Sequence, residues 1–211
     1  PEPMGPLRVA VFADFFDIFP ISWITEFLAR YPGVTLEFVV DNAYLDLMAS
    51  GVDLALRPES MLDENSTRRV LCTSRGQLVA SPKYLETRGT PANLDELGRH
   101  DCLLISRSSG PGTWHLNGPD GRSRVQVQGR LLASTSNPVR QAAVDGLGIA
   151  LLFDLYAKRD LAAGRLVPVL EQYRSDPSNF CAVFPNHRHI RRVATIFVDA
   201  VQSKLVEMYS E

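Results

Sequence analysis

The chain has 211 residues, a formal net charge of −2 and a composition that is 45% hydrophobic and 22% charged. These values are typical of a globular protein that can bury a substantial core. Direct binding of nucleic acid is disfavoured, because such binders usually carry a basic excess that this chain lacks. No apolar run reaches the length of a membrane span, so we expect no membrane segment.

The three cysteines, Cys72, Cys102 and Cys181, are odd in number and widely spaced. This pattern favours neither a disulfide framework nor a zinc site, and we expect reduced thiols in a cytoplasmic protein. The opening PEPMGPLR looks like a linker remnant, so we expect one domain of a longer protein.

The first part of the chain alternates predicted strands and helices. An apolar run at Leu7–Ala13 predicts a buried strand, and apolar spacing over Ile21–Tyr31 predicts a helix. Strands are expected at Val34–Val40 and Val52–Leu56, with a short helix at Ala43–Ser50 between them. This alternation predicts a parallel sheet with right-handed crossovers.

After a polar loop, the alternation continues to the end of the chain. The predicted elements are strands at Val70–Cys72 and Gln77–Ala80, a helix opened by Ser81-Pro82, a short helix at Leu94–Leu97, a strand at Asp101–Ile105, a hairpin between Arg107 and Arg124, a strand at Val125–Leu132, a helix at Val139–Asp145, a strand at Leu147–Phe153, a helix at Leu155–Ala163, strands at Leu166–Leu170 and Cys181–Phe184, and a long helix from His189 or Ile190 to Tyr209.

Five stretches in series carry a resemblance to a known family. They are Pro20–Glu37, Tyr44–Arg57 (YLDLMASGVDLALR), Leu78–Ile105, Val139–Leu152 (VRQAAVDGLGIALL) and Asp160–Leu170 (DLAAGRLVPVL). In this order and spacing they resemble the effector-binding half of LysR-type transcriptional regulators.

The resemblance implies an α/β fold of two Rossmann-like lobes joined by a two-strand hinge, like type 2 periplasmic binding proteins. Lobe I would comprise residues 1–75 and 180–211, and lobe II residues 76–179. It also implies a sensor that is not an enzyme, has no cofactor, and holds a small-molecule effector between the lobes. The winged helix-turn-helix that contacts DNA would belong to the parent protein and is absent from this chain.

The resemblance further implies a homodimer, and a tetramer in the full-length parent. The helix Ile21–Tyr31 would pack against a lobe II helix of the partner subunit. Trp23 and Ile24 either supply exposed apolar surface for this contact or are buried in their own core.

Ligands of open α/β sheets bind beyond the carboxyl ends of the strands, which selects three places for the effector site. The first is the loop of Asp14, Phe15, Phe16 and Asp17, where aspartates would repel a simple anion. Alternatively, the Phe pair packs in the core while the aspartates cap a helix.

The second place is Arg57, at the end of a predicted buried strand, where a charge needs a partner. Its guanidinium suits a ligand carboxylate. The alternative is a salt bridge to Asp14, Asp17 or Asp53.

The third place is Ser134, Thr135, Ser136 and Asn137, which open a predicted helix and offer hydroxyls and backbone N–H groups. One of them must cap the helix, and we expect at least one other to touch ligand. Ser81, Pro82 and Phe153 are weaker candidates for the same wall.

The Phe pair together with Arg57 points to an aromatic or amphipathic organic acid as the effector. A transport-type solute-binding protein and an enzyme on the same scaffold are the alternatives, although no catalytic residues are indicated by motif. His187 and His189 lack further ligands at useful spacing, so we expect no metal site.

Overall fold

The computed structural model describes residues 2–40, 49–62, 67–106, 108–185 and 190–210. Most of the helix predicted at Ala43–Ser50 lies outside these residues, as do His187 and His189. No helix in the described ranges is both long and apolar enough to cross a membrane.

The chain divides into two compact units. Unit 1 comprises Pro1–Thr73 and Ser178–Glu211, and unit 2 comprises Ser74–Pro177. The chain passes from one unit to the other within two long strands, β4 (Arg68–Ala80) and β11 (Arg174–Val183).

Unit 1 is built on β2 (Val34–Val40), β1 (Gly5–Val11) and β3 (Leu54–Pro58), followed in the sheet by β11 and then β4. β1 pairs in parallel with both β2 and β3, whereas β11 is antiparallel to β3. The apolar runs that predicted β1 and β3 are largely buried, as expected for parallel strands covered on both faces.

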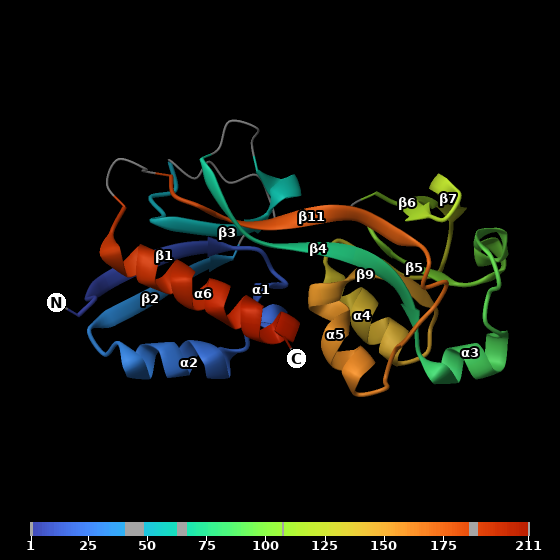
Figure 1. Ribbon diagram of the computed structural model, residues 1–211, viewed down its shortest axis with the longest axis horizontal. Helices are drawn as coiled ribbons and strands as arrows, with labels where there is room; N and C mark the ends of the chain where they lie inside the picture. The colour runs from blue at the N-terminus through green and yellow to red at the C-terminus, as the bar shows by residue number, and fades with distance from the viewer. Residues whose placement is uncertain (1, 41–48, 63–66, 107, 186–189, 211) are drawn as a thin grey trace. The chain divides into compact units, whose positions relative to one another are not determined.

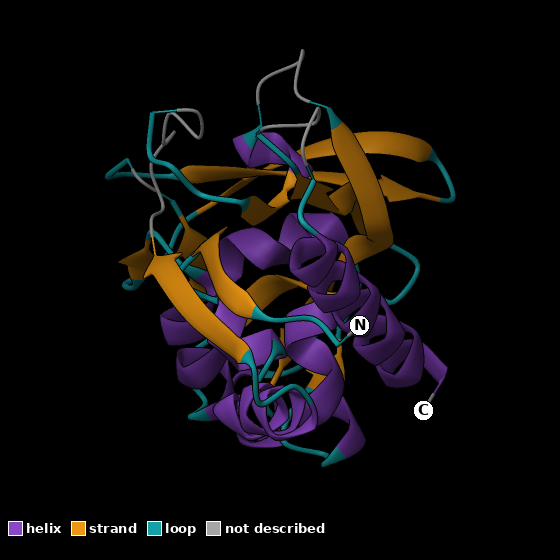
Figure 2. Ribbon diagram, turned by 90° about the vertical axis from the view of Figure 1, so that its left-hand side faces the viewer, coloured by secondary structure: helices purple, strands orange, loops and turns teal. Residues whose placement is uncertain are grey.

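The helices of unit 1 are α1 (Phe15–Ile18), α2 (Ile21–Arg30) and α6 (Arg192–Ser210), with a 3-10 turn, η1, at Glu59–Met61. Figure 1 shows α2 and α6 running along the β1–β2 part of the sheet, and Figure 2 shows the same layers by type of structure. Aromatic side chains fill the space between these elements. Ring contacts join Phe12, Phe15, Phe16, Phe19, Trp23, Phe27, Tyr31, Phe38, Phe180 and Phe197.

Unit 2 contains the second part of β4, then β9 (Ile149–Phe153), β5 (Cys102–Ile105) and β8 (Leu132–Ala133). β5 is parallel to both β8 and β9, whereas β4 is antiparallel to β9. The short β10 (Val167–Pro168) pairs with β4, and β6 (Gly112–Gly118) with β7 (Gly121–Val127) forms the predicted hairpin.

Both faces of the unit 2 sheet are covered. The helices are α3 (Pro82–Arg88), the 3-10 helix η2 (Leu94–Arg99), α4 (Ser136–Val144) and α5 (Asp154–Ala162). Successive residues of β5 alternate between two aliphatic cores: Cys102 and Leu104 join one, Leu103 the other. Successive side chains of a strand point to opposite faces of the sheet. Because both faces are covered here, every residue of this part of β5 must be apolar, which gives an unbroken apolar run in the sequence.

Several predicted strand boundaries are wrong, and three of the differences change the topology or the length of a strand markedly. β4 is one continuous strand and not two, because β11 pairs alongside it, with the hydroxyl of Thr73 bonded to Asn179 at 2.8 Å. The strand predicted at Val125–Leu132 ends at Val127. β11 begins at Arg174, well before the predicted Cys181, within a polar segment that contains Pro177.

Gly129 explains the early end of β7. The chain turns there so close to β5 that a Cβ atom on Gly129 would lie 1.9 Å from the carbonyl oxygen of Cys102. Only glycine allows this approach. The chain then rejoins the sheet as the short β8. Just before β8, the carbonyl of Leu131 accepts a hydrogen bond from the backbone N–H of Leu104 of β5 at 3.1 Å.

Candidate functional site

The carboxyl ends of β1 and β3 leave the unit 1 sheet at the same edge. The parallel register pairs Val11 with Leu56, so the residues that follow, Phe12 to Asp14 and Arg57, begin side by side. The strand-end rule therefore brings two of the three predicted places together within this unit.

Phe15 belongs to the core. It is fully buried and stacks on Phe19 with ring centroids 4.8 Å apart, as the packing alternative foresaw. Phe16 is half-buried and packs edge-on against Phe38 at 5.2 Å. Asp14 is buried at the amino end of α1, but its side chain makes no capping hydrogen bond there.

Arg57 is 1% exposed and is the largest of the fully buried side chains. It lies opposite Cys181 of the antiparallel β11, one residue before β3 ends. Of the three carboxylates suggested as its partners, Asp53 is engaged elsewhere. One oxygen of Asp53 accepts the backbone N–H of Arg8 at 2.9 Å and lies 3.4 Å from the guanidinium of Arg191.

In unit 2, the carboxyl ends of β5, β8 and β9 share one edge of the sheet, because these strands are mutually parallel. Ser106 follows β5, Ser134 follows β8 and Phe153 ends β9. The backbone N–H of Ser106 bonds to the carbonyl of Ala133 at 2.8 Å, which ties the first two ends together. Sequence reasoning missed Ser106, although a hydroxyl directly after a buried strand could have revealed it.

At the start of α4, Ser136 is buried and Asn137 is hydrogen-bonded within the protein, whereas Ser134 and Thr135 remain accessible. Thr135 is the N-cap residue by position but makes no side-chain capping bond, and Ser136 is buried within the first turn. Asn137 accepts a hydrogen bond at 3.0 Å from Arg140, whose other nitrogen reaches the buried Asp160 at 2.6 Å. Ser134 is exposed and Thr135 half-buried, which leaves these two as the accessible hydroxyls.

A polar group next to Phe153 was not foreseen. Asp154, the first residue of α5, accepts hydrogen bonds from Gln77 of β4 at 2.6 Å and from Arg174 of β11 at 2.8 and 2.9 Å. Gly76, which pairs with Phe153 in the sheet, donates its backbone N–H to Ser175 at 2.7 Å. No sequence signal marks this group, because Arg174 lies in a segment that reads as a loop.

Ser81 and Pro82 lie at the other edge of the unit 2 sheet. They follow the carboxyl end of β4, which is antiparallel to β9, so they are near the amino end of β9 and away from Phe153. The hydroxyl of Ser81 accepts the backbone N–H of Tyr84 at 3.1 Å and thereby caps α3. The structure therefore does not bring Ser81 and Pro82 together with Ser134 to Asn137.

Within unit 1, a groove of about 430 Å³ lies between α2 and α6. Trp23 and Tyr31 line one side and Ala200 and Ser203 the other, and none of the predicted site residues contributes. Among the residues that the structure describes, no group of three or more His, Cys, Asp or Glu side chains could hold a metal ion.

The cysteines are poor nucleophiles. Burial raises the pKa of Cys72 to about 11 and that of Cys102 to about 12, and it also raises the pKa of Cys181. All three thiols therefore stay protonated near neutral pH, and the thiolate that nucleophilic chemistry needs is scarce.

Comparisons with known proteins identify the family. Residues 1–206 match the LysR substrate binding domain. The chain is 32% identical over 206 residues to the HTH-type transcriptional regulator CrgA of Neisseria meningitidis serogroup C (strain 8013), covering 96% of this chain and 68% of that protein. It is 31% identical to PtxR of Pseudomonas aeruginosa, covering 97% of this chain and 65% of that regulator.

A solved structure shows the same architecture. The CrgA regulatory domain from Neisseria meningitidis superposes with a TM-score of 0.84 at 30% identity, covering 96% of this chain and all of that one. The predicted α/β, periplasmic-binding-protein-like fold is thus confirmed. The chain spans about two thirds of the length of these curated regulators.

These relatives are regulators of transcription, which sets aside both the transport-type and the enzyme alternatives. LysR regulatory domains bind small-molecule effectors and oligomerise. The chain belongs to the LysR-type transcriptional regulators, as the effector-binding regulatory domain of that non-enzymatic family.

Proposed function

We propose that the effector contacts the carboxyl-end edges of the two unit sheets: Arg57 with Asp14 and Phe16 in unit 1, and Ser134 with Thr135 in unit 2. Phe153 flanks the unit 2 edge in this proposal. Phe15, Ser136 and Asn137 support these residues by packing and hydrogen bonding. Ser81 and Pro82 are left out, because they lie at the opposite edge.

The observation that carries the proposal is the position of Arg57. Its guanidinium is 1% exposed and lies at the carboxyl end of a parallel strand, where ligands of open α/β sheets bind. The planar guanidinium of Arg57 can bind a carboxylate through two parallel hydrogen bonds. In the sequence Arg57 follows Leu56, which pairs with Val11, so its backbone lies next to the start of the loop that leads to Phe16.

The chemistry of these residues suggests an aromatic or amphipathic organic acid. Arg57 would bind the carboxylate, the half-buried Phe16 would contact an apolar or aromatic part, and the hydroxyls of Ser134 and Thr135 would bind polar substituents. The buried carboxyl of Asp14 favours a ligand with a hydroxyl or amine donor near its acid group.

Thermal-shift and calorimetric titrations with aromatic acids, aliphatic acids and sugars would test the site. A ligand at a hundred times its dissociation constant should stabilise the fold by about 2.7 kcal/mol. Thr135→Ala and Arg57→Lys should abolish or strongly weaken binding. Ser81→Ala is the matched control, because it removes a helix cap at the opposite edge and should leave affinity unchanged.

Two outcomes would contradict the proposal. Binding that survives both Thr135→Ala and Arg57→Lys would place the effector elsewhere. Binding that Ser81→Ala abolishes, with folding intact by circular dichroism, would move the site to the other edge of unit 2.

We propose an antiparallel, two-fold homodimer in which α2 meets a helix of unit 2 in the partner subunit. Within the sequence, unit 1 has nine Lys and Arg against fourteen Asp and Glu, whereas unit 2 has thirteen against ten. Opposite net charges favour this pairing of unlike units. Ile24 is buried and Trp23 packs on Phe27, so the exposed apolar side chain of α2 is Ile21, at 58%.

Ile21→Glu should raise the dimer dissociation constant, measured by sedimentation equilibrium, whereas the exposed Val206→Glu on α6 should not. A wild-type chain that stays monomeric at micromolar concentration would contradict the dimer. In the full-length parent we expect a tetramer in the cytoplasm that contacts DNA through its N-terminal helix-turn-helix domain.

A further inference from the structure

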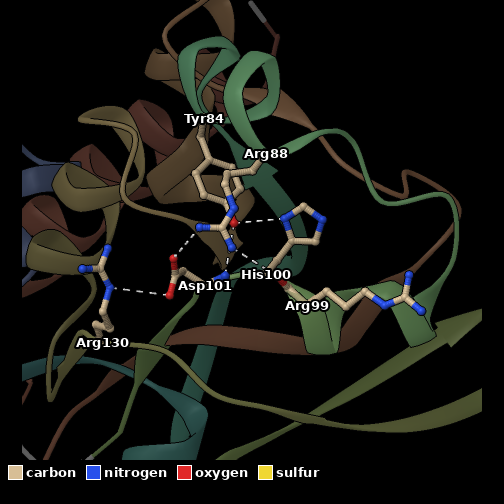
Figure 3. Close-up of polar contacts among 6 residues, drawn as sticks. All are labelled: Tyr84, Arg88, Arg99, His100, Asp101 and Arg130. Carbon is tan, nitrogen blue, oxygen red and sulfur yellow. Dashed lines mark hydrogen bonds and ion pairs between the residues drawn. The ribbon is translucent and has the colours of Figure 1, made fainter.

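A polar cluster lies at the amino-end edge of the unit 2 sheet, away from the proposed effector contacts. Tyr84 of α3 is 3% exposed, and its hydroxyl lies 3.0 Å from Nδ1 of His100. The backbone N–H of Asp101 donates to the same hydroxyl at 3.1 Å. Figure 3 shows the phenol of Tyr84 reaching both groups where η2 ends and β5 begins.

The direction of these bonds follows from the number of protons. A phenol has a single proton to donate, and it already accepts the N–H of Asp101. Every group is satisfied when Tyr84 donates to Nδ1, which requires that this nitrogen of His100 carry no proton. Burial raises the pKa of Tyr84, so its hydroxyl keeps the proton that it donates.

The charges around His100 oppose its protonation. Arg88 of α3 lies 3.5 Å from Asp101 and donates to the carbonyl of Arg99 at 3.3 Å. Arg130 approaches the other oxygen of Asp101 at 3.6 Å, so this carboxylate is shared by two guanidinium groups. Its charge is therefore largely compensated and stabilises an imidazolium only weakly.

The remaining acid near the ring is Glu96 of η2, whose carboxylate accepts the backbone N–H of Ala92 at 2.8 Å. Glu96 and Asp101 favour the protonated ring, but burial and Arg88 outweigh them, and the pKa of His100 lies below its usual value of 6.5. Neutral His100 is thus the state to which the folded cluster is adapted.

We propose that the Tyr84–His100 hydrogen bond is a proton-sensitive latch that holds α3 against the start of β5. Neutral His100 accepts the phenol proton and fixes Tyr84. Protonated His100 becomes a donor at Nδ1, competes with the N–H of Asp101 for the same oxygen, and repels Arg88. Because the backbone N–H of Tyr84 also bonds to Ser81, release would loosen the cap of α3 as well. This inference does not depend on where the effector binds.

Because the pKa of His100 is lowered in the folded chain, its contribution to stability decreases as the pH falls. A histidine whose pKa is lower in the folded than in the unfolded chain stabilises the fold fully above pH 6.5, and this contribution is lost as the pH falls. The loosening should therefore occur in mildly acidic solution and be confined to α3 and η2.

The test combines NMR titration of the histidine ring with amide hydrogen exchange of residues 82–88, at about pH 5 and about pH 7.5, a range in which histidine changes charge. We expect the pKa of His100 to lie below its usual value of 6.5 and Tyr84→Phe to move this midpoint upward. Exchange of α3 amides, corrected for the intrinsic rate, should speed up several-fold at the acidic pH in the wild type and in His115→Gln, but not in His100→Gln.

A His100 midpoint at or above 6.5 would overturn the latch, and so would a midpoint that Tyr84→Phe leaves unmoved. The same conclusion follows if α3 responds to acid equally in the wild type and in His100→Gln. The ring titration needs no folded variant, so the proposal can be refuted on the wild-type chain alone.

Discussion

The two units solve the problem of a stable interior differently. In unit 1, aromatic rings from both helices and strands fill the space around Phe197, which is fully buried against Trp23, Phe27 and Phe38. In unit 2 the cores are mainly aliphatic, and polar links hold the elements in place. Asp160 is 1% exposed and lies between Arg140 at 2.6 Å and Arg165 at 2.7 Å.

The contrast matters because the two devices respond to different conditions. Aromatic packing is insensitive to salt and pH, and its loss leaves a cavity. Exposed ion pairs weaken with salt, and ion pairs and hydrogen bonds of titratable groups weaken when protonation changes their charge. Unit 2 should therefore be the part of the domain that solution conditions change first.

Removing the central ring of unit 1 should have the largest effect. Phe197→Ala deletes a fully buried side chain and should lower the free energy of unfolding by about 3–5 kcal/mol. Chemical denaturation in low and high salt would measure it, and the loss should be the same in both. Val206→Ala, at a 60% exposed position on α6, is the control and should cost less than about 0.5 kcal/mol.

The second-largest loss of stability should follow from adding a methyl group at Gly129, where the backbone passes close to β5. Gly129→Ala places a Cβ atom against the carbonyl of Cys102, where only backbone can yield, and should destabilise by about 3 kcal/mol. Gly98→Ala in η2 meets nothing within 4 Å and should be neutral or slightly stabilising. Equal melting temperatures for the two variants would mean that the chain near Gly129 adjusts freely.

Breaking the buried ion pairs should have a somewhat smaller effect. Asp160→Asn leaves Arg140 without its charged partner between α4 and α5, and we expect a loss of about 2–3 kcal/mol that changes little with salt, because a buried pair is weakly screened. Asp199→Asn, which removes a surface pair with Arg69, should cost at most about 1 kcal/mol. A loss at Asp160 no larger than that at Asp199 would contradict the structural importance of the buried pair.

The smallest perturbation concerns the thiols. The pKa of Cys72 is raised from 9.0 to about 11, so at neutral pH its thiolate fraction should be roughly a hundredfold lower than that of an ordinary cysteine. The thiolate fraction of Cys102 should be lower still. Alkylation by iodoacetamide should be correspondingly slow in the folded chain and recover in denaturant. Rapid labelling of Cys102 under native conditions would show that unit 2 opens locally.

Much of this fold could be read from the sequence, because most elements are specified locally. The apolar runs of β1, β3 and β9 mark strands covered on both faces, and the spacing in α2 marks one buried helix face. The predictions failed where a segment is a strand because of the strands it pairs with and not because of its own apolar pattern. β11 begins in a polar segment, where Arg174 pairs with Asn117 of β6 and the side chains of Arg174 and Ser175 bond to Asp154 and Gly76.

The candidate site shows the same limit. Strand ends predicted Arg57, Ser134 and Thr135 from chain order alone, because a parallel sheet gathers such ends at one edge. The same rule could not exclude Ser81, since only the antiparallel register of β4 and β9 places it at the far edge. The contact of Tyr84 with His100 likewise depends on how η2 turns, which no residue pattern announces.

The discontinuity of unit 1 has a consequence for synthesis on the ribosome. Unit 2 is one continuous stretch, Ser74–Pro177, and can begin to fold as soon as it has emerged. Unit 1 must wait for Ser178 and the residues after it, because Phe197 completes its aromatic interior. Until then, Phe27 and Phe38 lack a main packing partner, so chaperones that recognise exposed aromatic segments should bind nascent chains stalled before α6 and release those that extend past it.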